Sequence, residues 1–174
     1  MTRKANTNSA IILLLGALAA IVFVAVGISS CQEDMGLAQP STGTIAAVAE
    51  LNEAQRVLAA GESYEGYALA LRVAVASYDG MVLHNAADTK VRATLKGSVE
   101  CLRAAREAWQ AQVEGEWAEE TYGSPEYWRA AHPSAELDLP EGELAADDVI
   151  AAALSCAEGG LAEASEMVGG VGGP

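Results

Sequence analysis

The chain has 174 residues, of which 51% are hydrophobic and only 5% are aromatic, and its formal net charge is −14. This length allows one domain with a substantial core, and the abundance of Ala, Leu and Glu favours an all-α domain. Arg3 and Lys4 precede every acidic residue, so the rest of the chain holds 8 basic and 24 acidic residues, a net charge of −16. A surface this acidic repels phosphate backbones, which excludes nucleic acid as a partner.

A basic amino terminus is followed by a long apolar run. The 19 residues from Ala10 to Ile28 carry no charge. As a helix they would span about 28 Å, just enough to cross the hydrocarbon core of a bilayer. The run is longer than the hydrophobic part of most secretory signals. Residues 1–30 are therefore expected to be either a cleaved signal peptide or a permanent signal anchor, and both interpretations export the acidic remainder.

The apolar run ends in the sequence ISSC, from Ile28 to Cys31. This stretch resembles the lipobox of bacterial lipoproteins, in which an aliphatic residue and two small residues precede the cysteine that receives lipid. Several acyl chains, such as palmitate, would anchor a protein stably through Cys31. The resemblance covers only the leader, and the usual box has Leu first and Ala or Gly before the cysteine. The alternative is a cysteine that happens to end a transmembrane helix.

The residue after the cysteine bears on the membrane in which the protein would sit. Lipoproteins of enteric bacteria with Asp at this position tend to stay in the inner membrane, whereas this chain has Gln32. The resemblance therefore implies the outer membrane, if the host has one, with the domain facing the periplasm or the exterior. Residues 31–43 would form the lipidated cysteine and a short polar linker.

Three cysteines are an odd number for an exported protein. Acylation of Cys31 would leave Cys101 and Cys156 as a pair, in a compartment that permits a disulfide. The alternative is that these two are buried free thiols. Neither has a metal-ligand spacing, and His84 and His132 stand far apart in the sequence. We therefore expect neither a metal nor a cofactor.

Residues 44–168 are predicted to form an antiparallel bundle of about four helices, each burying one apolar stripe. The first helix should start with Thr42 or Thr44 as its cap and end at Gly61. The second segment also alternates like a strand, but its interleaved alanines favour a helix. The stripes expected for these two helices are Ile45, Val48, Leu51, Gln55 and Leu58, and then Tyr64, Tyr67, Leu71, Val75, Tyr78 and Val82.

The third helix is expected to begin with Asp88 as its cap and to form an antiparallel hairpin with the second, over residues 63–113. The last helix should run from about Leu144 to Val168, and Gly159 and Gly160 are expected to weaken or kink it. Residues 169–174 would be a flexible Gly-rich tail. The predicted core stripes are Val91, Leu95, Val99, Leu102, Ala105, Trp109 and Val113, and then Ile150, Leu154, Ala157, Leu161, Ala164 and Val168.

Residues 114–143 break the helical pattern, and only residues 124–131 resemble a short helix. This connection concentrates Trp117, Tyr122, Tyr127 and Trp128 among acidic residues. These four side chains could form a contact patch for a cationic or sugar-bearing partner. The alternative, which we favour, is that they plug one end of the bundle. The acidic stretch at residues 136–148 lacks the alternating ligands of a calcium loop and is expected to be solvated.

The chain carries no nucleophile motif, no zinc-binding helix motif and no phosphate-cradling glycine loop. The sequence therefore predicts an exported, membrane-tethered helical lipoprotein without catalysis, which acts by binding a protein or cell-envelope partner or as a structural part of the envelope. The alternatives are a signal-anchored protein, a small immunity or exclusion factor, and an enzyme with scattered residues. A pocket with a buried Glu or His pair would favour the enzyme.

Overall fold

The computed structural model describes residues 39–118 and 121–170, and within them the regular structure is helical throughout. This confirms the predicted all-α bundle. No helix in the described part is long and apolar enough to cross a membrane. The leader, with Cys31, lies outside the described residues. The helices are α2 (Thr42–Ala60), α3 (Tyr64–Asp79), α4 (Ala86–Glu114), the 3₁₀ helix η1 (Glu116–Ala118), α5 (Pro125–Ala131) and α6 (Ala146–Gly169).

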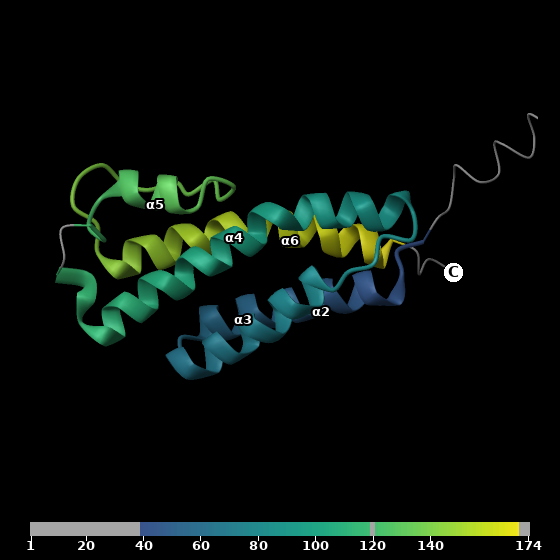
Figure 1. Cartoon of the computed structure of the whole chain (residues 1–174), viewed down its shortest axis with the longest axis horizontal. Helices are drawn as coiled ribbons and strands as arrows, with labels where there is room; N and C mark the ends of the chain where they lie inside the picture. Colours follow the sequence, from purple (N-terminus) through teal and green to yellow (C-terminus); the bar gives the residue numbers. More distant parts are fainter. Residues whose placement is uncertain (1–38, 119–120, 171–174) are drawn as a thin grey trace, which may run out of the picture. The chain divides into compact units, whose positions relative to one another are not determined.

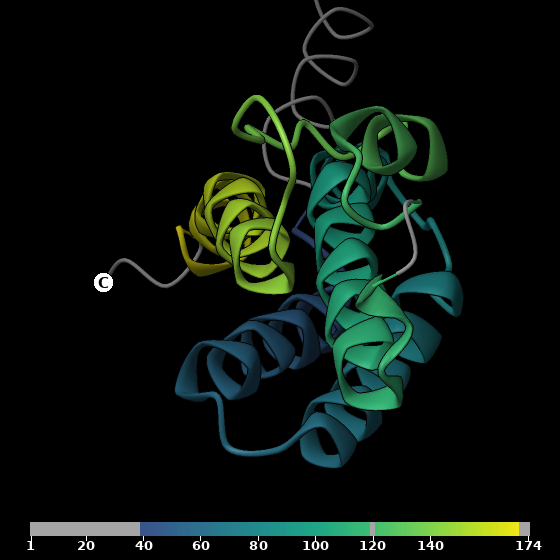
Figure 2. The ribbon, with the colours of Figure 1, turned by 90° about the vertical axis from the view of Figure 1, so that its left-hand side faces the viewer.

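Helix α4 is the central element of the bundle (Figure 1). It packs most extensively on α6, while α2 and α3 form a hairpin that contacts α4 and α6. Figure 2 shows α5 and the loop after it on the side of α4 and α6 that faces away from this hairpin. The ambiguous second segment is a helix, as predicted. Its closest partner is α2 and not α4, so the tight hairpin is α2–α3 instead of the expected pair over residues 63–113.

Small residues allow α4 and α6 to approach each other closely. Ser98 of α4 is buried, and its hydroxyl donates a hydrogen bond of 3.0 Å to the carbonyl oxygen of Ala157 in α6. A methyl group added to Gly160 would lie 2.4 Å from the Ser98 hydroxyl oxygen and 3.1 Å from the Thr94 carbonyl oxygen. Gly160 is therefore needed for close packing, and α6 runs without interruption through Gly159 and Gly160.

A buried carboxylate joins the beginnings of α2 and α4. Asp88 Oδ1 accepts hydrogen bonds from the Ser41 amide and the Thr44 hydroxyl, both at 2.7 Å, and Oδ2 accepts one from the His84 amide at 3.0 Å. Burial raises the pKa of Asp88, but these hydrogen bonds outweigh burial and lower the pKa to about 2. Asp88 thus stays ionised and ties the two helix starts together.

Two of the predicted caps are wrong. Asn85 caps α4 by accepting a hydrogen bond from the Asp88 amide, so Asp88 itself lies in the first turn of the helix. Ser41 caps α2 by accepting one from the Thr44 amide. In both cases a neighbouring polar residue caps the helix. The side chains of Thr44 and Asp88 instead form a hydrogen bond with each other, between the starts of α2 and α4.

The predicted core stripes fail at the ends of the helices. Val113 is 58% exposed because α4 extends beyond the α2–α3 hairpin (Figure 1). Trp109 still stacks on Tyr67 of α3, with ring centroids 5.9 Å apart, but it is only partly buried. Val82 is exposed because α3 ends at Asp79. Ile45 is exposed because Thr44 and Ala47 occupy the buried side of the first turns of α2. Sequence periodicity locates a stripe but does not show where the neighbouring helix stops.

The first half of α6 buries a different face from the one predicted. Val149 and Ala153 are fully buried, whereas Ile150 and Leu154 are only partly buried. Ala157, Leu161 and Ala164 are buried as predicted. The smaller side chains face α4 because the two helices approach closely there, and the larger ones lie at the edge of the interface.

The acidic connection before α6 is less solvated than expected. Its carboxylates are exposed, but Ala135, Leu137 and Leu139 alternate with them and are buried in the main core. Gly97 of α4 comes close to this loop, since a methyl group there would lie 3.4 Å from the Ser134 carbonyl oxygen. The loop therefore covers part of the bundle and presents its acids to solvent.

Candidate functional site

The disulfide connects the two central helices. Cys101 of α4 is bonded to Cys156 of α6, with 6.0 Å between their Cα atoms. This confirms the predicted pairing and lies within the usual range for a disulfide, roughly 4.4 to 6.8 Å. Cys101 is fully buried and Cys156 partly so. Such bonds are typical of proteins outside the cytoplasm, which suggests an extracytoplasmic helical domain.

The four aromatic residues of the 114–143 connection form one cluster. Trp117 stacks on Tyr122 and on Trp128, with ring centroids 5.9 and 5.8 Å apart, and Tyr127 packs edge-on against Trp128 at 5.2 Å. The indole nitrogens donate to backbone carbonyl oxygens of Leu144 and Tyr122. Trp128 is fully buried and the other three are partly buried. These contacts are those of a packing role, and a partner-binding role for the cluster stays a prediction.

A hydrogen-bonded network lies beside this cluster and was not anticipated from the sequence. Glu107 of α4 accepts a short hydrogen bond from the Tyr127 hydroxyl on one oxygen, and its other oxygen lies 3.2 Å from His132 Nε2. His132 is buried, stacks on Trp128, and has its Nδ1 atom 3.7 Å from a carboxylate oxygen of Glu100. Burial, followed by the hydrogen bond to Glu107, raises the pKa of Tyr127. The network thus joins α5 and its end to α4.

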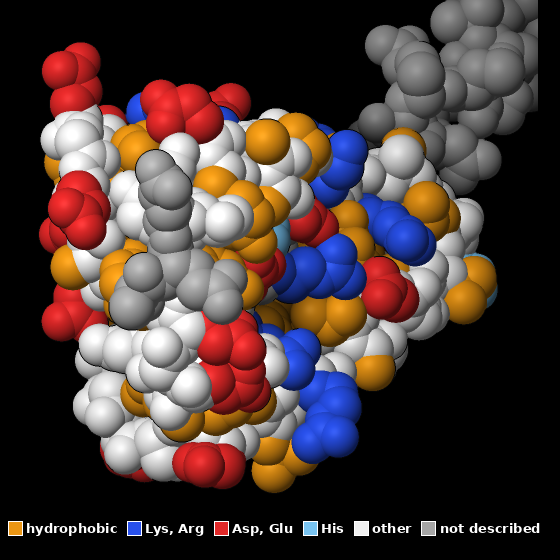
Figure 3. Space-filling view, turned by 60° about the vertical axis from the view of Figure 1, so that its left-hand side comes forward, with side chains coloured by type: hydrophobic (Ala, Val, Ile, Leu, Met, Phe, Trp, Pro, Cys, Tyr) orange, Lys and Arg blue, Asp and Glu red, His pale blue; other side chains and the backbone are white. Residues whose placement is uncertain are grey.

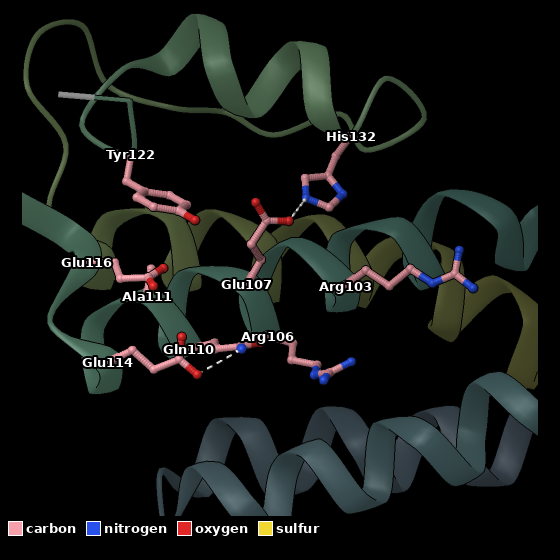
Figure 4. Close-up of a pocket in the computed structure, with 9 residues that line it drawn as sticks. All are labelled: Arg103, Arg106, Glu107, Gln110, Ala111, Glu114, Glu116, Tyr122 and His132. Carbon is pink, nitrogen blue, oxygen red and sulfur yellow. Dashed lines mark hydrogen bonds and ion pairs between the residues drawn. The ribbon is translucent and has the colours of Figure 1, made fainter. Parts of the chain in front are cut away.

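Among the described residues, Arg103 and Arg106 of α4 line two hollows, and the smaller of these lies next to this network. Its volume is about 440 Å³, and its walls include Glu107, Glu114, Glu116, Tyr122 and His132. Figure 4 shows Glu107 and His132 facing each other at its edge. Arg103 and Arg106 also line it, but their side chains extend away from His132 (Figure 4). Three carboxylates against two guanidinium groups make this hollow acidic.

The larger hollow lies between α3 and α4 and has the opposite charge. Its volume is about 610 Å³, and Arg103 and Arg106 of α4 line it together with Arg72 of α3. Glu65 is its one carboxylate. The apolar lining comes from Tyr64, Ala68, Leu71 and Val75.

Figure 3 shows a face of the molecule on which Lys and Arg side chains gather beside exposed hydrophobic side chains. In a chain with a net charge of −14, such a gathering is unexpected. The lining of the larger hollow, with three arginines and one carboxylate, also concentrates positive charge.

The arginines of the larger hollow differ in how they are paired. Arg103 contacts the Glu100 carboxylate at 2.6 Å and that of Asp79 at 3.9 Å. Among the described residues, neither Arg72 nor Arg106 has a carboxylate oxygen within 4.0 Å. Within the described part of the chain, two guanidinium groups of the larger hollow therefore have no carboxylate partner and are available to an anion.

Sequence reasoning did not identify either hollow. Arg72 belongs to a different helix from Arg103 and Arg106, and no motif connects them. The one available signal was the scarcity of basic residues, since three of the ten in the chain line one hollow. In the described part, no group of three or more His, Cys, Asp or Glu side chains is arranged to hold a metal ion.

Comparison of the chain with protein-family models, with curated proteins and with solved structures finds no match. The functional argument therefore depends on the residues of this chain alone.

Proposed function

We propose that this protein is an exported lipoprotein, tethered to the membrane through Cys31, whose helical domain acts by binding and not by catalysis. The observation that carries the anchor is the Cys101–Cys156 disulfide. It accounts for two of the three cysteines, so Cys31 is the thiol left for lipidation. The disulfide also supports export, because such bonds persist in oxidising compartments. The location would be the outer membrane where the host has one.

Metabolic labelling with palmitate tests the anchor. The wild-type protein should take up label and lose its leader, whereas Cys31→Ser should remain unlabelled with the leader attached. The matched control is the Cys101→Ser/Cys156→Ser double variant, which removes the other two thiols and should still be labelled. An unlabelled wild-type protein with an intact amino terminus would contradict the lipoprotein proposal and support the signal anchor.

The larger hollow supports a binding role. It has a volume of the size that small-molecule sites usually have, an apolar lining and a few charged groups at its edge. Of its three arginines, Arg103 is paired with Glu100, whereas Arg72 and Arg106 have no ion pair with another described residue. A role in immunity or exclusion would also be a binding role, and nothing in the hollow favours it specifically.

One observation favours an enzyme as a second candidate, namely the His132–Glu107 pair at the wall of the smaller hollow. However, both oxygens of Glu107 already have partners, one in Tyr127 and one in His132. The lining of this hollow also contains no Ser, Thr, Cys or Lys that could act as a nucleophile. The pair is better explained as a link that holds the end of α5 on α4.

A further inference from the structure

We propose that the larger hollow binds an organic anion that has one phosphate or carboxylate head and a short apolar body. This inference rests on the binding role proposed above, but it does not depend on the lipid anchor. The head would lie against Arg72 and Arg106, and the body would lie on Tyr64 and Val75.

The charge of the lining selects the sign of the ligand. The larger hollow has three arginines and one carboxylate, Glu65, among its lining residues. A cation would face a net positive wall, so it is disfavoured. The guanidinium group presents a planar fork of donors that matches carboxylate and phosphate oxygens.

The ion pairing of the three arginines limits the ligand to one anionic head. Arg103 already pairs with Glu100 and lies near Asp79, so it contributes its charge more than its donors. Arg72 and Arg106 are the guanidinium groups without a carboxylate partner in the described part of the chain. Two such groups suit one head, whereas a polyanion would meet the acidic surface around the hollow.

The rest of the lining requires an apolar part in the ligand. Tyr64 and Val75 are only partly buried and so leave apolar surface at the hollow, whereas Leu71 is 2% exposed and has almost none left to cover. Tyr64 is held in place by an edge-on contact with Trp109, with ring centroids 6.2 Å apart. Burying this surface under an alkyl or aryl group would add to binding roughly in proportion to the apolar area covered.

The smaller hollow serves as an internal comparison. It shares Arg103 and Arg106 with the larger one, but Glu107, Glu114 and Glu116 also line it. An anion would therefore be repelled there. Figure 4 shows that the Arg106 side chain points away from these acids and toward the α2–α3 hairpin, which is the side of the larger hollow.

Equilibrium dialysis of the full chain in phosphatidylcholine nanodiscs tests the proposal, with empty nanodiscs as the blank. The probes are hexyl phosphate, inorganic phosphate and hexanol. Hexyl phosphate should bind saturably and more tightly than either the head or the body alone. Arg72→Gln and Arg106→Gln should each weaken its binding about tenfold, the effect of losing one charge-assisted hydrogen bond. Arg129→Gln, an exposed arginine of α5, is the matched control and should leave binding unchanged.

A second pair of variants keeps the test independent of the arginines. Ala68→Glu places a carboxylate in the hollow, whereas Leu69→Glu places one on the exposed side of the same helix, α3. Only the first should abolish binding of hexyl phosphate, and both should keep the wild-type melting temperature within a few degrees. Equal effects of the two variants would overturn the proposal. Equal binding of hexanol and hexyl phosphate, or no saturable binding at millimolar concentration, would also overturn it.

A further arm identifies the source of the ligand. Nanodiscs that contain phosphatidylglycerol should weaken the binding of hexyl phosphate if the natural ligand is an anionic lipid head, and should have no effect if it is a soluble anion. Failure of palmitate labelling would leave these binding results intact, so failure of the lipid anchor and failure of the ligand site can be told apart.

Discussion

The two sides of α4 are fastened to their neighbours in different ways. Toward α6, small residues and the Cys101–Cys156 disulfide hold the helices in close contact. Toward the α2–α3 hairpin, the contact is made by larger and more polar groups. Asp88 joins α4 to the start of α2, and Tyr67 of α3 donates a hydrogen bond of 2.6 Å to the Leu102 carbonyl oxygen.

This difference explains where the hollow occurs. Arg103 lies 15 residues after Asp88, which is about 22 Å along a helix. Between α4 and α3 a hollow of about 610 Å³ remains, and arginines of both helices line it. On the α6 side the helices pack so closely that a methyl group at Gly160 would clash, and the hollow beside Gly160 has only about 160 Å³. One helix therefore supports a rigid interface on one side and a candidate binding site on the other.

Removal of the disulfide between α4 and α6 should have the largest effect on stability. The Cys101→Ala/Cys156→Ala variant should lose about 4 kcal/mol of unfolding free energy, since the bond closes a loop of 55 residues. Thermal unfolding with and without dithiothreitol measures the effect. The reductant should lower the melting temperature of the wild type and leave that of the double variant unchanged. The same melting temperature for the wild type under both conditions would contradict the prediction.

The hydrogen bonds that Asp88 accepts should make the contact between the starts of α2 and α4 sensitive to acid. The pKa of Asp88 is lowered to about 2 in the folded state, from an ordinary value of 3.8. A lowered pKa stabilises the fold above about pH 4, and this contribution is lost as the pH falls through about 2. Its upper limit is about 2 kcal/mol, since one pKa unit corresponds to roughly 1.4 kcal/mol.

Urea unfolding of the wild type and of Asp88→Asn at pH 7, 4 and 2 tests this expectation. The difference in unfolding free energy between the two proteins should shrink toward pH 2, because the carboxylates they share cancel in the comparison. Asp138→Asn, which changes an exposed carboxylate of the connection before α6, is the control and should have little effect at any of these pH values. If the difference in unfolding free energy stays constant with pH, the charge of Asp88 does not stabilise the contact between α2 and α4.

Alanine substitutions of two adjacent glycines of α6 test how closely α4 and α6 pack. The expected effect on unfolding free energy is the smallest for Gly159→Ala. Alanine should stabilise an exposed helix position by about 1 kcal/mol relative to glycine. Gly159→Ala meets no atom within 4 Å and should show this gain. Gly160→Ala forces the Ser98 hydroxyl to move from its bond to Ala157, and should be less stable than Gly159→Ala by about 1–3 kcal/mol. Equal unfolding free energies of the two variants would mean that the α4–α6 interface is looser than described.

The sequence by itself determined the helices and the disulfide. Helical periodicity placed four main helices, because an amphipathic helix must bury one stripe, and this property is local. The odd number of cysteines indicated the Cys101–Cys156 pair, since a leader cysteine could be set aside. The sequence also located Trp117, Tyr122, Tyr127 and Trp128 in one short connection, but their contacts with one another came from the structure.

Only the tertiary structure decided the features that depend on which helix faces which. Arg72 lies more than thirty residues from Arg103 and Arg106, and nothing in the local sequence indicates that they line one hollow. The partners of Asp88 and of His132 likewise come from segments distant in the chain. Periodicity fixes a buried face only to within about one residue, or roughly 100° of rotation. Periodicity therefore could not distinguish a stripe through Ile150 from one through Val149. Only the packing shows that α6 turns its smaller side chains toward α4.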